Sequence, residues 1–206
     1  MGIEFRRLQE GDLDLLLELK EKMSDKSRDL FCPYPWDDDK KLRYVLRQAI
    51  GKSESGTDAS YIIIKPHREI VGHCFLWKAG INPHSQPFEV RVPELGICIV
   101  DAHQNKGFGR LGVQFLITVA KELEKDAIEL TTAQENTNGF DLYSSEGFEY
   151  TGLIRNPLEV DVTEVAIGEM VATKFRVERQ MAYIINMNKK NRVLEYLASK
   201  RKAYSI

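Results

Sequence analysis

A loop rich in glycine is the part of this sequence with the clearest chemical potential. Gly107, Gly109 and Gly112 lie in it, directly after P-E-L-G-I-C-I-V at residues 93–100, an apolar run typical of a strand buried on both faces. Residues 108–125 follow with apolar side chains at helical spacing. A strand, a glycine loop and a helix in this order present free amide N–H groups to a phosphate. Two different classes of cofactor are bound in this way, so other residues must distinguish them.

Composition limits the classes of protein that this chain can belong to. Its 206 residues suit one domain, and 43% hydrophobic with 29% charged residues is ordinary for a soluble globular protein. The net charge of −2 provides no basic field for nucleic acid. Cys32, Cys74 and Cys98 form no C-x-x-C pair, so neither a zinc site nor a disulfide framework is expected. Since we find no apolar run of signal-peptide or membrane-span length, we expect a cytoplasmic protein without a membrane partner.

The elements that must position the loop can be predicted from periodicity. Strands are expected at residues 3–8, 61–65, 70–78, 90–100, 127–133, 148–153 and 181–187, and helices at about 12–23, 37–51, 108–125, 138–146 and 188–201. Residues 25–36 are predicted to be a loop, because Pro33 and Pro35 cannot lie inside a helix. Residues 155–179 show no clean period and are expected to be strand or loop. This order predicts a mixed sheet in an α+β domain spanning residues 1–187, with 188–206 as a C-terminal helix or tail packed on it or extending from it.

The spacing G-x-G-x-x-G at Gly107 also fits a dinucleotide-binding loop, but its context does not. In that fold the first glycine follows the strand almost directly, and an acid ends the next strand. Here D-A-H-Q-N-K intervenes, and Glu129 lies inside the next strand. The G-K-S at residues 51–53 fails as a P-loop, because Leu46 stands where its first glycine is needed.

Two motifs together point to another cofactor. Q-N-K-G-F-G, starting at Gln104, fits Q/R-x-x-G-x-G/A, and N-T-N-G-F-D-L-Y-S-S-E-G-F fits N-x-x-A-x-x-L-Y-x-x-x-G-F. In the second motif Gly139 replaces the usual alanine, and the matching positions are Asn136, Leu142, Tyr143, Gly147 and Phe148. With both motifs at suitable separation, the chain resembles the GNAT superfamily of acyl-CoA N-acyltransferases. The resemblance spans residues 2–186 in element order and is specific over 93–148.

This resemblance implies a fold and an acetyl-CoA site. The expected sheet is mixed, mostly antiparallel, splayed at its middle strands and flanked by helices. The pyrophosphate would lie on the loop amides and pantetheine along residues 97–99, with a strand N–H near Cys98 or Ile99 as oxyanion donor. The implied cofactor-binding residues are Ile97, Cys98, Ile99, Gln104, Asn105, Lys106, Gly107, Phe108, Gly109, Arg110 and Asn136.

The resemblance also implies two catalytic residues. Tyr143 would donate a proton or a hydrogen bond to the departing thiolate, although it could instead be a core tyrosine packed on Phe148. Glu94 opens the central strand, where many relatives place the general base; a solvated strand-end carboxylate is the alternative.

The acceptor site is less visible in the sequence. The resemblance points to Phe31, Tyr34 and Trp36, which could line a pocket or simply cap the core. His73 is expected to be a structural partner, and His103 to lie on the surface. A solvated helix face is expected for the basic C-terminal residues, which are Lys189, Lys190, Arg192, Lys200, Arg201 and Lys202.

The predicted function is transfer of an acetyl group from acetyl-CoA to a primary amine by direct attack in a ternary complex. The amine could belong to a small molecule, a peptide N-terminus or a lysine. One alternative is a non-catalytic acyl-CoA-binding module, and the other is a nicotinamide-dependent dehydrogenase. No metal is expected, and a homodimer is considered.

Overall fold

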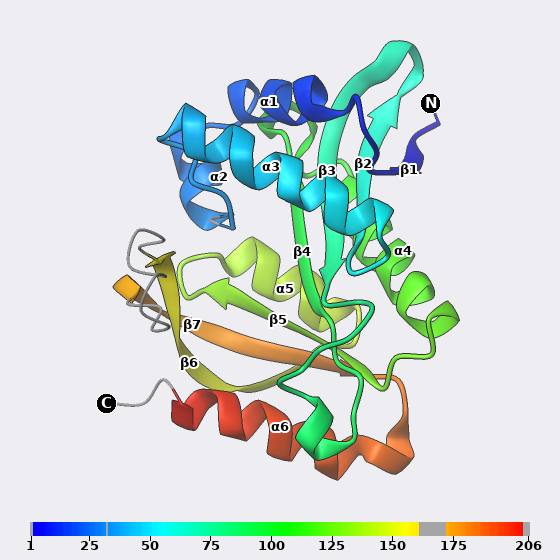
Figure 1. The fold of residues 1–206 in the computed structure, drawn as a ribbon, viewed down its shortest axis with the longest axis vertical. Coiled ribbons are helices and arrows are strands. Elements are labelled where there is room, and N and C mark those ends of the chain that lie inside the picture. Colours follow the sequence, from blue (N-terminus) through cyan, green and yellow to red (C-terminus); the bar gives the residue numbers. More distant parts are fainter. Residues whose placement is uncertain (1, 32, 161–171, 204–206) are drawn as a thin grey trace.

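The computed structural model describes residues 2–31, 33–160 and 172–203. Figure 1 shows strands and helices mixed along the whole chain. The strands are β1 (Glu4–Arg7), β2 (Ala59–Lys65), β3 (Glu69–Trp77), β4 (Glu94–Ile99), β5 (Ala127–Ala133), β6 (Glu149–Val160) and β7 (Ala172–Ile184). The helices are α1 (Leu13–Glu21), α2 (Asp25–Leu30), α3 (Asp39–Glu54), α4 (Phe108–Glu122), α5 (Thr137–Ser145) and α6 (Lys190–Ala203).

The seven strands form one sheet in the order β1-β2-β3-β4-β5-β7-β6. Every neighbouring pair is antiparallel except β4 with β5. That parallel pair has a single register position, Glu94 opposite Glu129, and then the strands diverge. In Figure 1, β5 runs across β4 rather than alongside it. The predicted mixed, mostly antiparallel sheet with splayed middle strands is therefore confirmed, and we call the divergence point at Glu94 and Glu129 the fork.

Helices cover both faces of the sheet and bury three apolar clusters. The first cluster lies under α4 and α5 and includes Val71 and Leu116. The second lies under α1 and α3 and includes Leu16 and Leu42. In the third, Val193 and Leu197 of α6 pack with Ala127 of β5 and Ala182 of β7. Because such burial removes apolar area from water, it positions α6 against the half of the sheet beyond the fork.

The basic residues of α6 and its lead-in bind the domain, which differs from the solvated helix face predicted for them. Lys189 pairs with Asp126, Lys190 with Glu149 and Lys200 with Glu129, at 3.2, 3.0 and 2.9 Å. Arg192 also pairs with Glu89. The prediction was wrong for Lys189, Lys190 and Lys200, because helical periodicity cannot show which carboxylates a docked helix will meet, whereas Arg192 is 53% exposed as predicted.

Local boundaries also differ from the predictions. Residues 25–30 form α2 instead of a loop, because the Ser24 hydroxyl accepts the Ser27 N–H and caps a helix before the prolines. Helix α3 continues past Gly51 to Glu54. Strands β6 and β7 extend into most of residues 155–179, for which no clean period was found; residues 161–171 lie outside the described residues.

Two glycines of the domain should respond to alanine in opposite directions. At Gly72 a Cβ would lie 2.4 Å from the Cys98 carbonyl oxygen, whereas nothing lies within 4 Å of the corresponding position at Gly51. We expect Gly72→Ala to lower the free energy of unfolding by about 1–3 kcal/mol through overpacking. Gly51→Ala, inside α3, should raise it by roughly 0.5–1 kcal/mol. Urea denaturation of both variants measures this, and equal midpoints would contradict the close approach of β3 to β4.

Candidate active site

Strand β4 offers backbone donors on the side where β5 diverges. The Val100 N–H donates to the Val71 carbonyl of β3 at 2.9 Å. Since antiparallel bonding alternates along a strand, the Cys98 N–H also points toward β3, and those of Ile97 and Ile99 point toward the gap. The oxyanion donor was predicted near Cys98 or Ile99. Because Cys98 uses its N–H within the sheet and Ile99 does not, the Ile99 N–H is the one available for that predicted role.

The glycine loop ends in an uncapped helix start. Gly107 is the N-cap of α4 with φ +85°, which favours glycine, and Asn105 has φ +58°. No described side chain caps α4. The N–H groups of Phe108, Gly109 and Arg110 therefore stand at the positive end of the helix dipole, which is a site suited to phosphate.

Side chains of the same loop bind protein groups. Gln104 Nε2 donates to the Ile99 carbonyl at 3.0 Å and to Ser27 Oγ at 3.1 Å, which ties the loop to β4 and α2. Lys106 donates to the Ala102 carbonyl at 2.6 Å, and Arg110 pairs with Glu146. These contacts brace the loop, so its backbone amides are the groups best placed to receive a phosphate.

Packing explains why the glycines of this loop have the spacing of a dinucleotide-binding loop. A Cβ on Gly112 would lie 2.4 Å from Ile97 Cδ1, so this glycine lets α4 approach β4 closely. A Cβ on Gly109 would meet only Leu142 at 3.3 Å and Ile99 at 4.0 Å. The third glycine of G-x-G-x-x-G thus has a packing role, while the first is required by its backbone conformation.

Asn136 has a structural role in addition to its predicted contact with the cofactor. Its Oδ1 accepts the Gly139 N–H at 3.0 Å and its Nδ2 donates to Thr132 Oγ1 at 3.1 Å, so it caps α5. A Cβ at residue 139 would lie 2.5 Å from that Nδ2. This contact explains the glycine that replaces the alanine usual in the motif.

Replacing Asn136 with alanine should therefore destabilise the domain. Loss of the cap is expected to lower the free energy of unfolding by about 1 kcal/mol, while Asn136→Ser, which can still cap, should recover most of it. Thermal unfolding together with coenzyme A titration measures both roles. Loss of coenzyme affinity in both variants at unchanged stability would contradict the capping role and favour direct contact with the cofactor.

Tyr143 lies on α5 and faces the apolar cluster under α4 and α5. It is buried, and its ring centroid lies 5.9 Å from that of Phe148. Burial, with a smaller contribution from the Cys98 thiol, raises the pKa of Tyr143 to about 12. The hydroxyl is therefore protonated at neutral pH and can act only as a neutral donor or acceptor.

A cavity of about 580 Å³ opens between the two arms of the splayed sheet. Its wall is built by α2, by strands β3 to β7 and by α6, and includes Glu94 and Phe31. Tyr34 and Trp36 do not line it and are 4% and 6% exposed. Tyr34 hydroxyl bonds His73 Nε2 at 2.9 Å within the core.

The aromatic residues predicted for the acceptor site do not all lie at the cavity. Of Phe31, Tyr34 and Trp36, only Phe31 reaches the cavity. The Trp36 indole N–H donates to the Phe31 carbonyl at 2.7 Å, so Trp36 helps to hold Phe31 in place. The prolines keep this segment out of a helix, and Tyr34 and Trp36 lie buried in the apolar cluster under α1 and α3.

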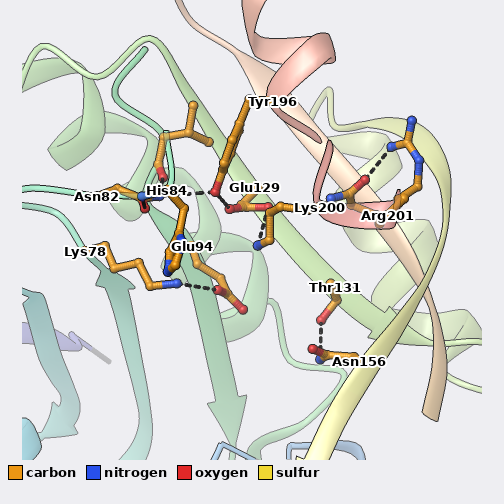
Figure 2. Close-up of polar contacts among 12 residues, drawn as sticks. Lys78, Asn82, His84, Glu94, Glu129, Thr131, Asn156, Tyr196, Lys200 and Arg201 are labelled. Atoms are coloured by element: carbon orange, nitrogen blue, oxygen red, sulfur yellow. Dashed lines mark hydrogen bonds and ion pairs between the residues drawn. The ribbon is translucent and has the colours of Figure 1, made fainter. Parts of the chain in front are cut away.

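Polar residues gather around the fork (Figure 2). Glu94 lies 3.8 Å from Lys78, and Glu129 accepts from Lys200 at 2.9 Å and from the Tyr196 hydroxyl at 2.7 Å. Asn82 donates to the same hydroxyl at 3.2 Å. Figure 2 shows that these side chains come from β4, β5, α6 and the segment after β3, and meet on one side of the sheet.

Several of these residues were missed from sequence. Tyr196 and Lys200 are four residues apart on the same face of α6 as the buried Val193 and Leu197, which was a usable signal. Glu129 interrupts an apolar strand and is 1% exposed, another signal of a buried polar function. Nothing in the sequence indicated which helix would reach which strand.

Neither a metal-ligand cluster nor a membrane-spanning helix is found among the residues that the structure describes. No group of three or more His, Cys, Asp or Glu side chains is placed to hold a metal ion there. None of the described helices combines the length and apolar character needed to cross a bilayer. His103 was expected on the surface, but its side chain is only 12% exposed and lies beside Glu69, with Nε2 at 2.7 Å from Oε1.

Together, the splayed sheet, the uncapped helix beside one arm and the cavity with a carboxylate at the fork define an acyl-CoA-dependent transferase. The sequence profile of the acetyltransferase (GNAT) domain matches residues 3–149. The chain belongs to this family, so it is an acetyl-CoA-dependent acetyltransferase, and the predicted family, activity and cosubstrate are confirmed. With one parallel strand pair, the sheet is not that of a nicotinamide dehydrogenase.

Solved structures show the same fold. A spermidine N-acetyltransferase from Vibrio cholerae, in complex with CoA and spermine, is 18% identical with a TM-score of 0.64, over 92% of this chain and 98% of that chain. An acetyltransferase of the GNAT family from Streptococcus pneumoniae is 16% identical with a TM-score of 0.61, over 89% and 100%. The ribosomal L7/L12 alpha-N-protein acetyltransferase RimL is 17% identical with a TM-score of 0.65, over 90% and 91%. By sequence, no curated protein matched the chain.

Proposed function

We propose that this protein transfers the acetyl group of acetyl-CoA to a single primary amine carried on a largely apolar body, by direct attack in a ternary complex. The observation that carries this proposal is the fork. Beyond Glu94 and Glu129 the strands separate, so the amides of β4 and the cavity border the same gap. Two reactants bound on either side of that gap would react without a covalent enzyme intermediate, and their proximity would supply a large share of the rate gain.

The residues around the gap fit acetyl-CoA. The amides of Phe108, Gly109 and Arg110 would hold the pyrophosphate, because the helix start offers donors and the favourable end of the dipole. The N–H of Ile97 and that of Ile99 would bind the pantetheine arm and the thioester carbonyl. When bound, acetyl-CoA supplies the activated acetyl group.

Two side chains would assist the transfer, one by accepting a proton and the other by donating a hydrogen bond. Glu94, at the mouth of the gap and lining the cavity, would take a proton from the attacking ammonium, directly or through a water molecule. Tyr143 would donate a hydrogen bond to the sulfur that leaves. Because its pKa of about 12 lies well above that of an ordinary thiol, near 8.5, full proton transfer from Tyr143 is uphill, and we assign it hydrogen-bond stabilisation.

Cavity chemistry indicates the acceptor class. Phe31, Phe75 and Trp77 contribute aromatic surface, with the rings of Phe75 and Trp77 stacked at 4.5 Å. The lining has no acidic excess: the cations Lys78, Arg176 and Lys200 outnumber the carboxylates Glu94 and Glu178. A polyamine would need an acidic excess that this wall does not offer, whereas one amine on an apolar group, such as a peptide N-terminus, fits it.

Binding and turnover test this function separately. Calorimetry should detect coenzyme A, and free-thiol release should follow addition of short peptides with a free apolar N-terminal residue. The same peptides with blocked N-termini are the control, and spermidine is the polyamine arm. Coenzyme A binding without thiol release from any amine would favour the non-catalytic binding module, and faster release with spermidine than with peptides would overturn the acceptor class.

The cellular location and the partners of the enzyme are also proposals. We infer a cytoplasmic location, where acetyl-CoA is available and where the buried thiols of Cys74 and Cys98 stay reduced. We expect no nucleic-acid partner, because the net charge is −2 and Lys189, Lys190 and Lys200 are paired within the domain. A homodimer is a prediction that sedimentation can check.

A further inference from the structure

Two carboxylates face each other at the fork. Glu94 and Glu129 are register partners of the parallel pair β4–β5, so their side chains leave the sheet on the same side. Like charges directly opposite each other destabilise a sheet. The Glu129 side chain is 1% exposed and the Glu94 side chain 23% exposed, so water screens this repulsion poorly. Some neighbouring positive charge must compensate it.

The compensating charge at Glu129 comes from the C-terminal helix. Lys200 Nζ lies 2.9 Å from Glu129 Oε2, and the Tyr196 hydroxyl occupies Oε1 at 2.7 Å. Lys200 and Glu94 both line the cavity. Figure 2 shows the two side chains with Glu129. The Lys200 side chain is 19% exposed, so the ammonium beside Glu129 is only partly hydrated.

Other charged groups also surround the fork. Lys78, after β3, pairs with Glu94 at 3.8 Å, and both are partly exposed. On β7, Arg176 pairs with Glu178 at 2.6 Å. His84 also lines the cavity. Lys200 differs from these groups because it pairs with the buried Glu129 while its charge also acts on Glu94.

The electrostatic balance at Lys200 agrees with this geometry. Burial by itself would lower the pKa of Lys200, but the carboxylate of Glu129, followed by that of Glu94, raises it above the ordinary lysine value. Lys200 is thus a permanent cation at neutral pH, and both carboxylates interact with its charge.

We propose that Lys200 is a positioning residue for acetyl transfer: it neutralises Glu129 at the fork and thereby keeps the opposing Glu94 in the ionised form that accepts a proton. This inference rests on the proposed base role of Glu94. It also assigns a function to the docked C-terminal helix, which completes the acceptor side of the site.

The test compares pH profiles of kcat/KM for variants that change one charge at a time. Lys200→Met should move the acidic limb to higher pH by about one unit, because the two carboxylates then titrate as a coupled pair without their cation. Glu129→Gln should move it to lower pH, since Lys200 then attracts Glu94 unopposed. Lys200→Arg should leave the limb in place, as should Lys202→Met, which removes an exposed lysine of the same helix.

A second readout does not depend on activity. Carbon-13 NMR titration of the Glu94 carboxyl, assigned with Glu94→Gln, should show the same opposite shifts in Lys200→Met and Glu129→Gln, and thermal unfolding identifies any variant that fails to fold. If Lys200→Met is unfolded, Lys200→Arg and Glu129→Gln carry the comparison. The inference is overturned if neither Lys200→Met nor Glu129→Gln shifts the Glu94 titration, or if both shift it equally. Shifted NMR titrations with unshifted kinetic limbs would keep the charge coupling but refute Glu94 as the base.

Discussion

Tyr143→Phe should lower kcat about 10²-fold while the affinity for coenzyme A is nearly unchanged. The hydroxyl is the only group that this substitution removes, and the ring can keep its packing on Phe148. Because the pKa of Tyr143 is raised to about 12, the wild-type hydroxyl stays protonated, and its loss should cost the same factor at every pH from about 6 to 10. Steady-state kinetics over that range, with calorimetry for coenzyme A, measure both quantities.

The matched control for this change is Tyr44→Phe, because Tyr44 is 65% exposed and lies on α3. It should leave kcat and unfolding unaltered. If Tyr143→Phe keeps full kcat, Tyr143 is only a core residue. If kcat falls only in proportion to lost stability, the hydroxyl has no part in stabilising the departing thiolate.

Glu94→Gln should lower kcat/KM for the amine by about 10²–10³-fold at neutral pH and remove the acidic limb of the pH profile. A base must be ionised to accept a proton, so the activity of the wild type should fall toward acidic pH. The amide cannot accept that proton at any pH, so the variant should depend on pH only through the amine itself. A profile of kcat/KM from about pH 5 to 10 measures this.

Glu124→Gln is a suitable comparison, since the Glu124 side chain is 81% exposed and lies outside the cavity. We expect its profile to match that of the wild type. An acidic limb that survives in Glu94→Gln would assign the base to another group, with His84 on the cavity wall as the next residue to replace.

The local geometry on the side that we assign to the cofactor could be predicted, because it depends on neighbouring residues. The helix start at Gly107 depends on a positive φ and on the lack of a capping side chain, both settled within a few residues. The cap at Asn136 likewise involves Gly139, three residues away. Such contacts recur wherever the same residue types recur at the same spacing, which is why the two motifs indicated the family.

The acceptor side was harder to predict because its contacts are distant in sequence. The aromatic loop after α2 could have lined a pocket or filled the core, and it does both: Phe31 reaches the cavity, and Tyr34 is buried against His73, 39 residues away. Exposure of a large apolar side chain depends on which helices cover it. Periodicity within one segment cannot decide that question.

By itself, the sequence determined the fold class, the coenzyme loop and the position of Tyr143 within a short helix, since hydrogen bonding and dihedral preferences along neighbouring residues specify each of them. Only the tertiary structure decided that β4 and β5 part after a single register pair and that Lys200 reaches Glu129, 71 residues away. The physical reason is that burial of apolar surface docks α6 onto the sheet, and this docking selects which charges meet. Ion pairs so distant in sequence follow from packing, and no spacing rule encodes them.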